Sequence, residues 1–310
     1  MHLGMIGLGR MGANMVRRLA AGGHRIAAYD VDPERAPGLA AELEGVRAAA
    51  TPGELVAALP QPRTVWLMVP HEHVDETILA LIDAGLGAGD VLVDGGNSNY
   101  RESINRAHRL EEFGVEFVDC GTSGGVWGLT HGYSLMLGGS DDALARLQPA
   151  LETLAPAPDR GWGHVGPAGA GHFTKMVHNG IEYGLMQAWA EGMELLDARR
   201  DLVRDPGQVT RIWQHGSVVR SWLLDLIADA LARDPELASL SDYVEDSGEG
   251  RWTVHEGIEQ AVPLPVISLA LQMRFRSRQR NTMAGRVLNA LRAGFGGHPI
   301  RPAAGEEEDQ

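Results

Sequence analysis

The fold of this chain is decided near its start, by the stretch His2-Leu3-Gly4-Met5-Ile6-Gly7-Leu8-Gly9-Arg10-Met11-Gly12. A short apolar run ends in glycines and leads into Arg10–Ala21, where apolar residues recur at helical spacing. In the pattern G-x-G-x-x-G, the first glycine permits a tight turn, the second lets the backbone approach a pyrophosphate, and the third packs helix on strand. The helix start then supplies amide donors for an anion. We expect a dinucleotide to bind at Gly7, Leu8, Gly9, Arg10, Met11 and Gly12.

The first half of the chain continues to alternate strand and helix. The predicted strands are Arg25–Asp30, Thr64–Val69, Val91–Asp94 and Val115–Asp119. The predicted helices are Val74–Ala84, Arg101–Phe113 and one that begins at the capping box of Thr51 and Glu54. This alternation predicts βαβ units, and hence an α/β Rossmann-like, doubly wound parallel sheet over residues 1–165.

The second half changes character after the glycine-rich loop Gly161–Gly171. Helical patterns cover Phe173–Arg200, Pro206–His215, Val219–Ala232 and Pro263–Ala293. We therefore expect an all-α domain over residues 166–304. Residues 305–310 are expected to be a frayed acidic tail.

Composition excludes several classes of protein. The 310 residues are 44% hydrophobic and 22% charged, as in soluble globular proteins, and the net charge of −14 disfavours nucleic acid and anionic membranes as partners. A single cysteine, Cys120, fits a reducing compartment. The N-terminus does not resemble a signal peptide, and no apolar run is long enough to span a membrane. We expect a cytoplasmic protein.

The residue after the second strand predicts which dinucleotide binds. Asp30 follows Gly12 by 18 residues, where a carboxylate accepts hydrogen bonds from the ribose 2′-OH and repels a 2′-phosphate. No arginine follows directly, because Val31–Glu34 is acidic, so NAD is expected rather than NADP. Val69, Pro70 and Asn97 are further candidate cofactor contacts, and Asn97 is also a candidate substrate contact. The alternatives are a glycine-rich turn without a ligand and, for Asn97, a simple Asx turn.

Four polar residues share one face of the helix that follows the glycine-rich loop. Lys175, His178, Asn179 and Glu182 stand at i, i+3, i+4 and i+7, which places Lys175 and Glu182 about 10 Å apart along the axis. The alternative is a solvated helix face. The basic residues are 26 arginines and one lysine, Lys175. Arginine does not lose its proton, whereas lysine can act as a general base, so we interpret Lys175 as a catalytic amine.

Two further features suggest anion binding. The segment Cys120–Gly125 follows a strand and presents amides and a hydroxyl, although it can equally be a turn without a ligand. An arginine-rich segment stands out in an acidic chain, and most of its members are expected on a solvated face, with one or two of them functional. These arginines are Arg274, Arg276, Arg278, Arg280, Arg286 and Arg292.

Together these residues resemble the 6-phosphogluconate dehydrogenases, in their short form with a single helical domain. The matching stretches are GLGRMGANM, LVDGGNS, CGTSGGVWG, GPAGAGHFTKMVHNGIEYG, SGEGRWTVHE, VPLPVI and GFGGH, which span nearly the whole chain. The stretch around Lys175 is the most specific, because related β-hydroxyacid dehydrogenases keep the lysine but not the His-Asn-Gly-Ile-Glu-Tyr run.

The resemblance implies oxidative decarboxylation of 6-phosphogluconate to ribulose 5-phosphate, a pentose phosphate pathway reaction. Lys175 is implied to be the base at the C3 hydroxyl, and Glu182 the acid that protonates C1 of the enediol. Sugar-acid contacts are implied at Ser123, Gly124, Gly125, His178 and Asn179, and phosphate contacts at Tyr183, Arg251 and Arg274. His298 is implied to reach a neighbouring subunit, so a dimer or tetramer is expected. No metal is expected.

Two departures from the family pattern stand out. Trp127 replaces an acidic residue of the long form, which puts that contact in doubt. Asp30-Val31-Asp32 replaces the Asn-Arg-Thr that reads NADP in many members, which favours NAD. Two alternative functions stay open: a β-hydroxyacid dehydrogenase or sugar-acid reductase that does not decarboxylate, and a catalytically silent NAD-binding regulatory protein.

Overall fold

The structure, a computed structural model, describes residues 1–296 and 299. The expected acidic tail and His298 therefore lie outside the described residues. The chain divides into two compact units, Met1–Asn179 and a second that begins at Gly180. The boundary expected from the sequence, between residues 165 and 166, precedes the helix Ala170–Asp197, and the division by contacts falls within that helix.

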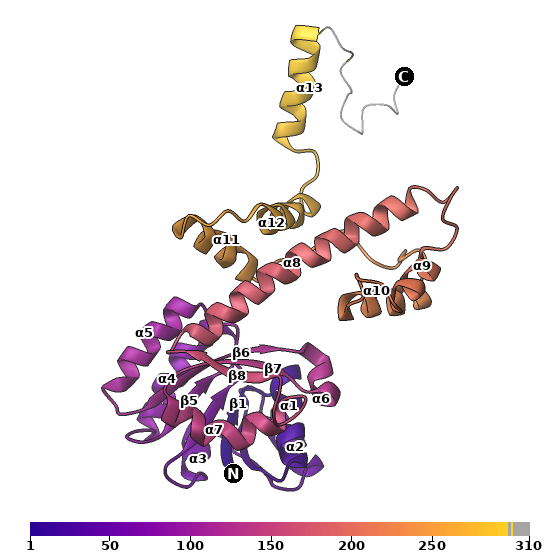
Figure 1. The fold of residues 1–310 in the computed structure, drawn as a ribbon. Coiled ribbons are helices and arrows are strands. Elements are labelled where there is room, and N and C mark those ends of the chain that lie inside the picture. Colours follow the sequence, from indigo (N-terminus) through magenta and orange to yellow (C-terminus); the bar gives the residue numbers. More distant parts are fainter. Residues whose placement is uncertain (297–298, 300–310) are drawn as a thin grey trace. The chain divides into compact units, whose positions relative to one another are not determined.

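The first unit is built on one eight-stranded sheet with the order β3-β2-β1-β4-β5-β6-β7-β8 (Figure 1). Its strands are β1 (His2–Ile6), β2 (Arg25–Tyr29), β3 (Val46–Ala48), β4 (Thr64–Leu67), β5 (Val91–Asp94), β6 (Glu116–Ser123), β7 (Ser134–Gly138) and β8 (Trp162–Gly166). The chain reverses its direction of travel across the sheet between β1 and β4. Ligands of doubly wound sheets bind outside the carboxyl ends of the strands at such a switch point.

The expected parallel sheet is confirmed for most of its strands, with a departure at one edge. Strands β1 to β6 are parallel, but β7 pairs with β6 in the antiparallel direction, and β8 runs parallel to β7. The predicted strands also omit β3, β7 and β8. An antiparallel strand at the edge of a largely parallel sheet is common, and its direction depends on pairing between segments distant in sequence rather than on a local pattern.

Helices cover both faces of this sheet. One face packs against α1 (Arg10–Ala21), α2 (Arg35–Glu42) and α7 (Asp141–Leu154), and the other against α3 (Pro52–Ala57), α4 (Val74–Asp83) and α5 (Tyr100–Glu111). The short α6 (Gly128–His131) follows β6. Alternate residues of each central strand enter the two cores: Met5 and Trp66 lie in one, Ile6 and Leu67 in the other. The doubly wound prediction is therefore confirmed.

The helix α8 (Ala170–Asp197) begins against β6 through a buried carboxylate. Asp119, on β6, accepts hydrogen bonds from the backbone N–H groups of Gly169 at 2.6 Å and His172 at 2.7 Å. Burial raises the pKa of Asp119, while His172 opposes that shift. A carboxylate that accepts from free amides at a helix start fixes the position of that start.

The same junction brings two backbones unusually close together. A Cβ at Gly121 would lie 2.4 Å from Cβ of Lys175 and 2.6 Å from the carbonyl oxygen of Gly171. A Cβ at Gly171 would lie 2.5 Å from the carbonyl oxygens of Asp119 and Met136. Glycine at both positions therefore lets the second turn of α8 rest directly on β6.

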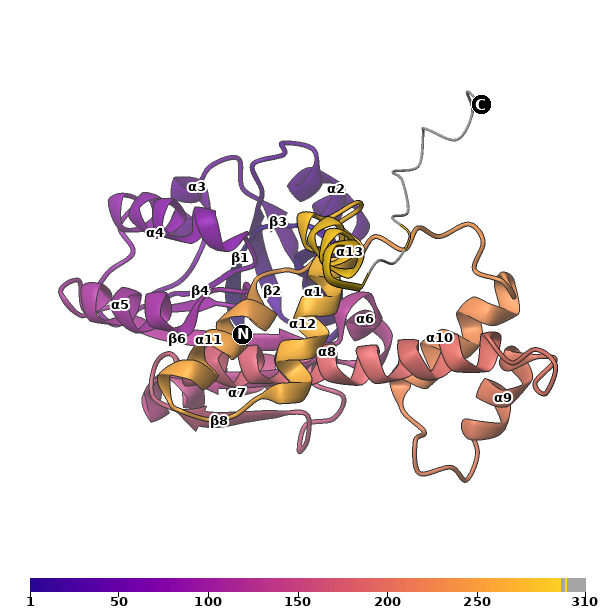
Figure 2. The same cartoon turned by 90° about the horizontal axis from the view of Figure 1, so that it is seen from above.

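The second unit is helical, as predicted. After its part of α8 it contains α9 (Pro206–Trp213), α10 (Trp222–Arg233), α11 (Glu249–Glu259), α12 (Pro265–Ser277) and α13 (Met283–Gly296). Figure 2 shows α9 beside α10, and these two helices pack on each other. Among the described residues, none of the helices combines the length and the apolarity that a bilayer crossing requires.

The predicted helix over Pro263–Ala293 is wrong in one respect. It is two helices, α12 and α13, with Arg278–Thr282 between them. Asn281 has a φ of 48°, a left-handed conformation that asparagine tolerates and a continuous helix excludes.

The contact between β6 and α8 can be tested by adding one methyl group. We expect Gly121→Ala to lower the free energy of unfolding by about 1–3 kcal/mol, since the new Cβ meets Lys175 and a carbonyl oxygen. Gly163→Ala on β8 is the matched control, because nothing lies within 4 Å of its Cβ. Urea denaturation followed by circular dichroism measures both. Equal midpoints for the two variants would contradict the contact.

Candidate active site

The glycine-rich turn between β1 and α1 has the geometry of a dinucleotide cradle. Gly7 has a φ of 90°, and a Cβ there would lie 2.5 Å from the carbonyl oxygen of Met68. A Cβ at Gly12 would lie 1.9 Å from the carbonyl oxygen of Gly7, so only glycine lets α1 pack on the turn. The Cβ position of Gly9, by contrast, faces open space. The amides at the start of α1 and this open side fit a pyrophosphate.

Asp30, just after β2, is tied to the turn itself. Its Oδ2 accepts a hydrogen bond of 2.5 Å from the backbone N–H of Leu8, and Oδ1 accepts one of 2.9 Å from Asp32. The carboxylate is almost fully buried. It therefore lies beside the predicted cofactor turn, where a ribose hydroxyl is recognised in such folds.

Arg35 is a neighbour of Asp30 that the sequence-based prediction omits. Its Nη1 lies 3.5 Å from Oδ2 of Asp30, and its Nε lies 3.1 Å from Oδ2 of Asp32. In the sequence, acidic residues separate Arg35 from Asp30. In the fold, α2 begins at Arg35 and places this side chain near the end of β2.

The loops after β4 and β5 lie beside the glycine-rich turn. A Cβ at Gly7 would lie 3.0 Å from Cγ1 of Val69, and a Cβ at Gly96 would lie 2.7 Å from the carbonyl oxygen of Val69. Pro70 follows Val69, and Asn97 follows Gly96 with its side chain exposed. The predicted cofactor residues thus gather at the carboxyl edge of the sheet.

A buried polar network holds the loop that carries Asn97. Asp94, at the end of β5, accepts hydrogen bonds from Ser98 Oγ at 2.7 Å and Arg106 Nη1 at 3.3 Å. Arg106 is 1% exposed and also pairs with Asp75, which lowers the pKa of Asp75. Arg106 was not predicted from the sequence, because its partners are brought together only by the sheet.

Lys175 lies on the face of α8 that meets β6, and it is only 8% exposed. A solvated lysine on an exposed helix face is therefore excluded. Nearby on the same helix, His178 Nε2 lies 3.3 Å from Ser123 Oγ at the end of β6, and His178 Nδ1 lies 3.0 Å from Oδ1 of Asn179. The structure thus brings four of the predicted catalytic and sugar-acid residues to one junction within the first unit.

The segment after β6 forms a tight glycine turn. Gly124 has a φ of 124° and Gly125 a φ of 50°, conformations that favour glycine. Trp127, the departure from the family pattern, is exposed and stacks on His131 with ring centroids 5.9 Å apart. Glu182 continues the face of Lys175 two turns further along α8 and is half-buried.

Within the second unit, two of the predicted phosphate residues are in contact. The guanidinium carbon of Arg274 lies 3.6 Å from the ring centroid of Tyr183. Arg274 also donates a 2.6 Å hydrogen bond to the carbonyl oxygen of Glu245, and the hydroxyl of Tyr183 accepts one from the N–H of Ser247. A Cβ at Gly250 would lie 2.4 Å from the Tyr183 ring, which places the start of α11 against it.

Arg251, the third predicted phosphate residue, is paired with a carboxylate in the same unit. Arg251 and Arg278 each donate a 2.5 Å hydrogen bond to Asp246, and their guanidinium groups hold the pKa of Asp246 below its usual range. Of the six arginines in the arginine-rich segment, Arg274 contacts Tyr183 and Arg278 pairs with Asp246. Arg292 lies exposed on α13, and His298 lies outside the described residues.

Comparisons with known proteins match both halves of the chain. The NAD binding domain of 6-phosphogluconate dehydrogenase matches residues 2–165, and the C-terminal domain of 6-phosphogluconate dehydrogenase matches residues 171–293. A relative from Haloferax volcanii, the NAD(+)-dependent, decarboxylating 6-phosphogluconate dehydrogenase, is 43% identical over 97% of this chain and 98% of its own length.

Solved structures extend the likeness to the fold. The Plasmodium falciparum 6-phosphogluconate dehydrogenase is 29% identical, with a TM-score of 0.81 over 99% of this chain and 67% of that one. The Mycobacterium tuberculosis 3-hydroxyisobutyrate dehydrogenase, at 23% identity and a TM-score of 0.70 over 89% of this chain and 92% of that one, shares the fold alone. The chain belongs to the 6-phosphogluconate dehydrogenase family.

Proposed function

We propose that this chain catalyses the oxidative decarboxylation of 6-phospho-D-gluconate to D-ribulose 5-phosphate and CO₂, with reduction of NAD. The observation that carries this proposal is the buried position of Lys175, the sole lysine, on the helix that also carries Glu182. A buried amine among polar residues at the carboxyl edge of a dinucleotide-binding sheet is suited to proton transfer. The 43% identity to an NAD(+)-dependent, decarboxylating relative supports the same reaction.

The proposed cofactor contacts come from three loops of the first unit. The turn Gly7–Gly12 would hold the pyrophosphate of the dinucleotide, and Asp30 would accept hydrogen bonds from its ribose hydroxyls. Val69, Pro70 and Asn97 would contact the rest of the dinucleotide. A bound NAD would supply the hydride acceptor for the oxidation at C3 of the substrate. The open Cβ side of Gly9 and the buried carboxylate of Asp30 are what favour this arrangement.

Lys175 is the proposed general base of the oxidation. In its neutral form, Nζ takes the proton of the C3 hydroxyl as hydride leaves C3, and a 3-keto acid results. The ammonium of Lys175 then donates a hydrogen bond to the new carbonyl oxygen, which favours cleavage of the C1–C2 bond. The electron pair of that bond enters the enediol, O3 takes back the proton, and CO₂ leaves.

Glu182 is the proposed acid of the final step. Its carboxyl group protonates the carbon that lost CO₂, which is C1 of the product, while the adjacent enediol hydroxyl returns a proton to Lys175. The ketone of ribulose 5-phosphate forms, and the amine ends protonated. Lys175 therefore ends the reaction with one extra proton, and Glu182 ends it with one fewer. Both groups must return to their starting protonation states before the next turnover.

Substrate recognition is assigned to two groups of residues. Ser123, Gly124, Gly125, His178 and Asn179 are proposed to bind the sugar acid, with Asn97. Tyr183, Arg251 and Arg274 are proposed to bind the phosphate, because arginine matches phosphate oxygens in two-point geometry. We further propose that the protein acts in the cytoplasm as a dimer or tetramer, with His298 completing a neighbouring subunit's site.

Steady-state kinetics of the purified protein tests the proposed function. We expect turnover of 6-phosphogluconate with NAD, a much lower kcat/KM with NADP, and no turnover of 3-hydroxyisobutyrate. The arginine cluster of the second unit favours a phosphorylated substrate over a short hydroxyacid. Preferred turnover of a non-phosphorylated hydroxyacid would favour the alternative dehydrogenase, and NAD binding without turnover would favour the regulatory protein.

The role of the lysine is tested by a substitution that keeps its charge. We expect Lys175→Arg to lower kcat at least about 100-fold, because the guanidinium cannot act as a base. NAD binding, measured by fluorescence quenching, should be retained, which shows that the variant is folded. Unchanged turnover would refute the assignment of Lys175 as the base.

The phosphate assignment is tested on α12. We expect Arg274→Ala to raise KM for 6-phosphogluconate about 10- to 100-fold with a smaller change in kcat, because a charge-assisted hydrogen bond to phosphate is lost. Arg276→Ala is the control, since Arg276 is an exposed arginine on the same helix whose guanidinium donates, among the contacts described, only to the carbonyl oxygen of Gln279. Equal KM values for the two variants would remove Arg274 from the site.

A further inference from the structure

One buried side chain is bonded to the segments that support both loops after β4 and β5. Arg106, in the middle of α5, is 1% exposed. Its guanidinium contacts side chains at the start of α4, at the end of β5, in the loop after β5 and on α5 itself. These partners, which form the Arg106 network with it, are Asp75, Asp94, Ser98 and Glu102. A single cation thus joins segments up to 31 residues apart in the sequence.

The bonds on the β5 side fix the residues before and after Asn97. Arg106 Nη1 donates to Ser98 Oγ at 3.0 Å, and Ser98 Oγ donates to Oδ2 of Asp94 at 2.7 Å. Oδ1 of Asp94 accepts a hydrogen bond of 3.2 Å from the backbone N–H of Gly96. Asn97 therefore lies between two residues that are bonded to one fully buried carboxylate, and Arg106 balances the charge of that carboxylate.

The bonds on the α4 side support the loop that carries Val69 and Pro70. Arg106 Nε donates to Oδ1 of Asp75 at 3.0 Å, and Nη2 donates to its Oδ2 at 3.3 Å, which is a two-point contact. Asp75 lies in the first turn of α4, five residues after Pro70. The two loops also touch, because a Cβ at Gly96 would lie 2.7 Å from the carbonyl oxygen of Val69. Arg106 thus connects the supports of two loops that are already in contact.

We propose that Arg106 is a positioning residue of the cofactor site, which sets the place of Asn97 relative to Val69 and Pro70. The inference rests on the proposed function, which assigns these three residues to NAD and Asn97 also to the substrate. Arg106 acts through the carboxylates and the hydroxyl that it binds, and it is not itself a ligand. A displacement of about 1 Å can cost about 100-fold in rate, so the position of Asn97 affects turnover as well as binding.

The shape of the guanidinium group explains why this position needs an arginine. Its five N–H donors lie in one plane, so it can bond to Asp75, Asp94 and Ser98 together while it stays charged. The donors of a lysine amine all lie on one nitrogen, so Arg106→Lys keeps the charge and loses the connection. Ser98→Ala is the milder change, because it keeps both ion pairs of Arg106 and removes only the hydroxyl next to Asn97.

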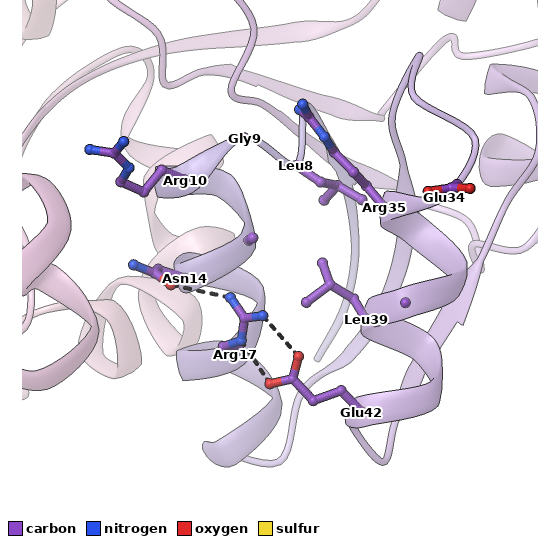
Figure 3. Close-up of a pocket in the computed structure, with 11 residues that line it drawn as sticks. Leu8, Gly9, Arg10, Asn14, Arg17, Glu34, Arg35, Leu39 and Glu42 are labelled. Carbon is purple, nitrogen blue, oxygen red and sulfur yellow. Dashed lines mark hydrogen bonds and ion pairs between the residues drawn. The ribbon is translucent and has the colours of Figure 1, made fainter.

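The other half of the proposed cofactor site provides an internal reference. A pocket of about 620 Å³ lies between the glycine-rich turn and α2 (Figure 3). Two of its lining residues, Leu8 and Arg35, contact Asp30, where the ribose of the adenosine half is expected. Of the described residues that line this pocket, none belongs to the Arg106 network. Binding of 5′-ADP therefore reports an intact turn and is independent of the position of Asn97.

Calorimetric titration of the full chain with NAD and with 5′-ADP measures the effect without turnover. We expect Ser98→Ala to weaken NAD binding about 3- to 10-fold and Arg106→Lys to weaken it at least about 10-fold. The affinity for 5′-ADP should change less than about twofold. In steady-state kinetics, both variants should lower kcat/KM for 6-phosphogluconate about 10- to 100-fold.

Arg109→Ala is the matched control for the loss of an ion pair. Arg109 lies on the same helix, is exposed and pairs with the same carboxylate, that of Asp75. Among the contacts described, it makes none with the loop of Asn97. We expect NAD affinity and kcat/KM to stay within about twofold of the wild type, because Asp75 keeps its two bonds from Arg106.

The same measurements in an Asn97→Ala background separate positioning from a general loss of structure. If the network acts through Asn97, the Asn97→Ala variant has already lost what the network provides. Adding Ser98→Ala should then lower NAD affinity and kcat/KM less than about twofold further. A general loss of structure would lower both by the same factor in either background.

Three outcomes overturn the inference: wild-type NAD affinity and kcat/KM in Ser98→Ala and Arg106→Lys, an equal loss in Arg109→Ala, or the same loss in the Asn97→Ala background. If Arg106→Lys does not fold, it fails to bind 5′-ADP and Ser98→Ala decides alone. A wild type that binds NAD without turning over 6-phosphogluconate would instead contradict the proposed function, and the NAD titrations would still test the inference.

Discussion

The close approach of β6 to the first turns of α8 is the constraint on which the candidate site depends. Asp119 fixes the start of the helix through two backbone amides, and Gly121 and Gly171 let the helix rest on the strand. This contact buries the stem of Lys175 and brings His178 to the end of the same strand. A lysine placed in this way is largely screened from bulk water and lies near the polar residues proposed to bind the sugar acid.

Several arginines also form ion pairs that connect different segments of the chain. Arg106 ties the loop after β5 to α4 and α5, and Arg251 and Arg278 share the carboxylate of Asp246. The guanidinium group suits these roles because it stays charged and bonds in several directions at once. The single lysine and the arginines named here thus lie in different environments in the fold.

Local signals in the sequence predicted the first half of the fold well. The glycine pattern located β1 and α1, and Thr51 accepts from the N–H of Glu54 as its capping box predicts. The features that were missed depend on contacts that local patterns do not show. They are the antiparallel β7, the pairing of Arg35 with Asp30, and the hydrogen bonds from the start of α8 to Asp119. No periodicity or spacing encodes such pairs. The break before α13 was missed although residues 277–282 carry no apolar side chain and Asn281 adopts a left-handed conformation that a continuous helix excludes.

The central claim is that Lys175 and its helix serve an oxidation that ends in loss of CO₂. Product analysis with 6-phosphogluconate labelled with ¹³C at C1 tests this most directly, by following labelled CO₂ against NADH formation in the same sample. The account predicts one labelled CO₂ for each NADH formed and an unlabelled ribulose 5-phosphate. NADH formation with the label retained in an oxidised six-carbon acid would contradict it.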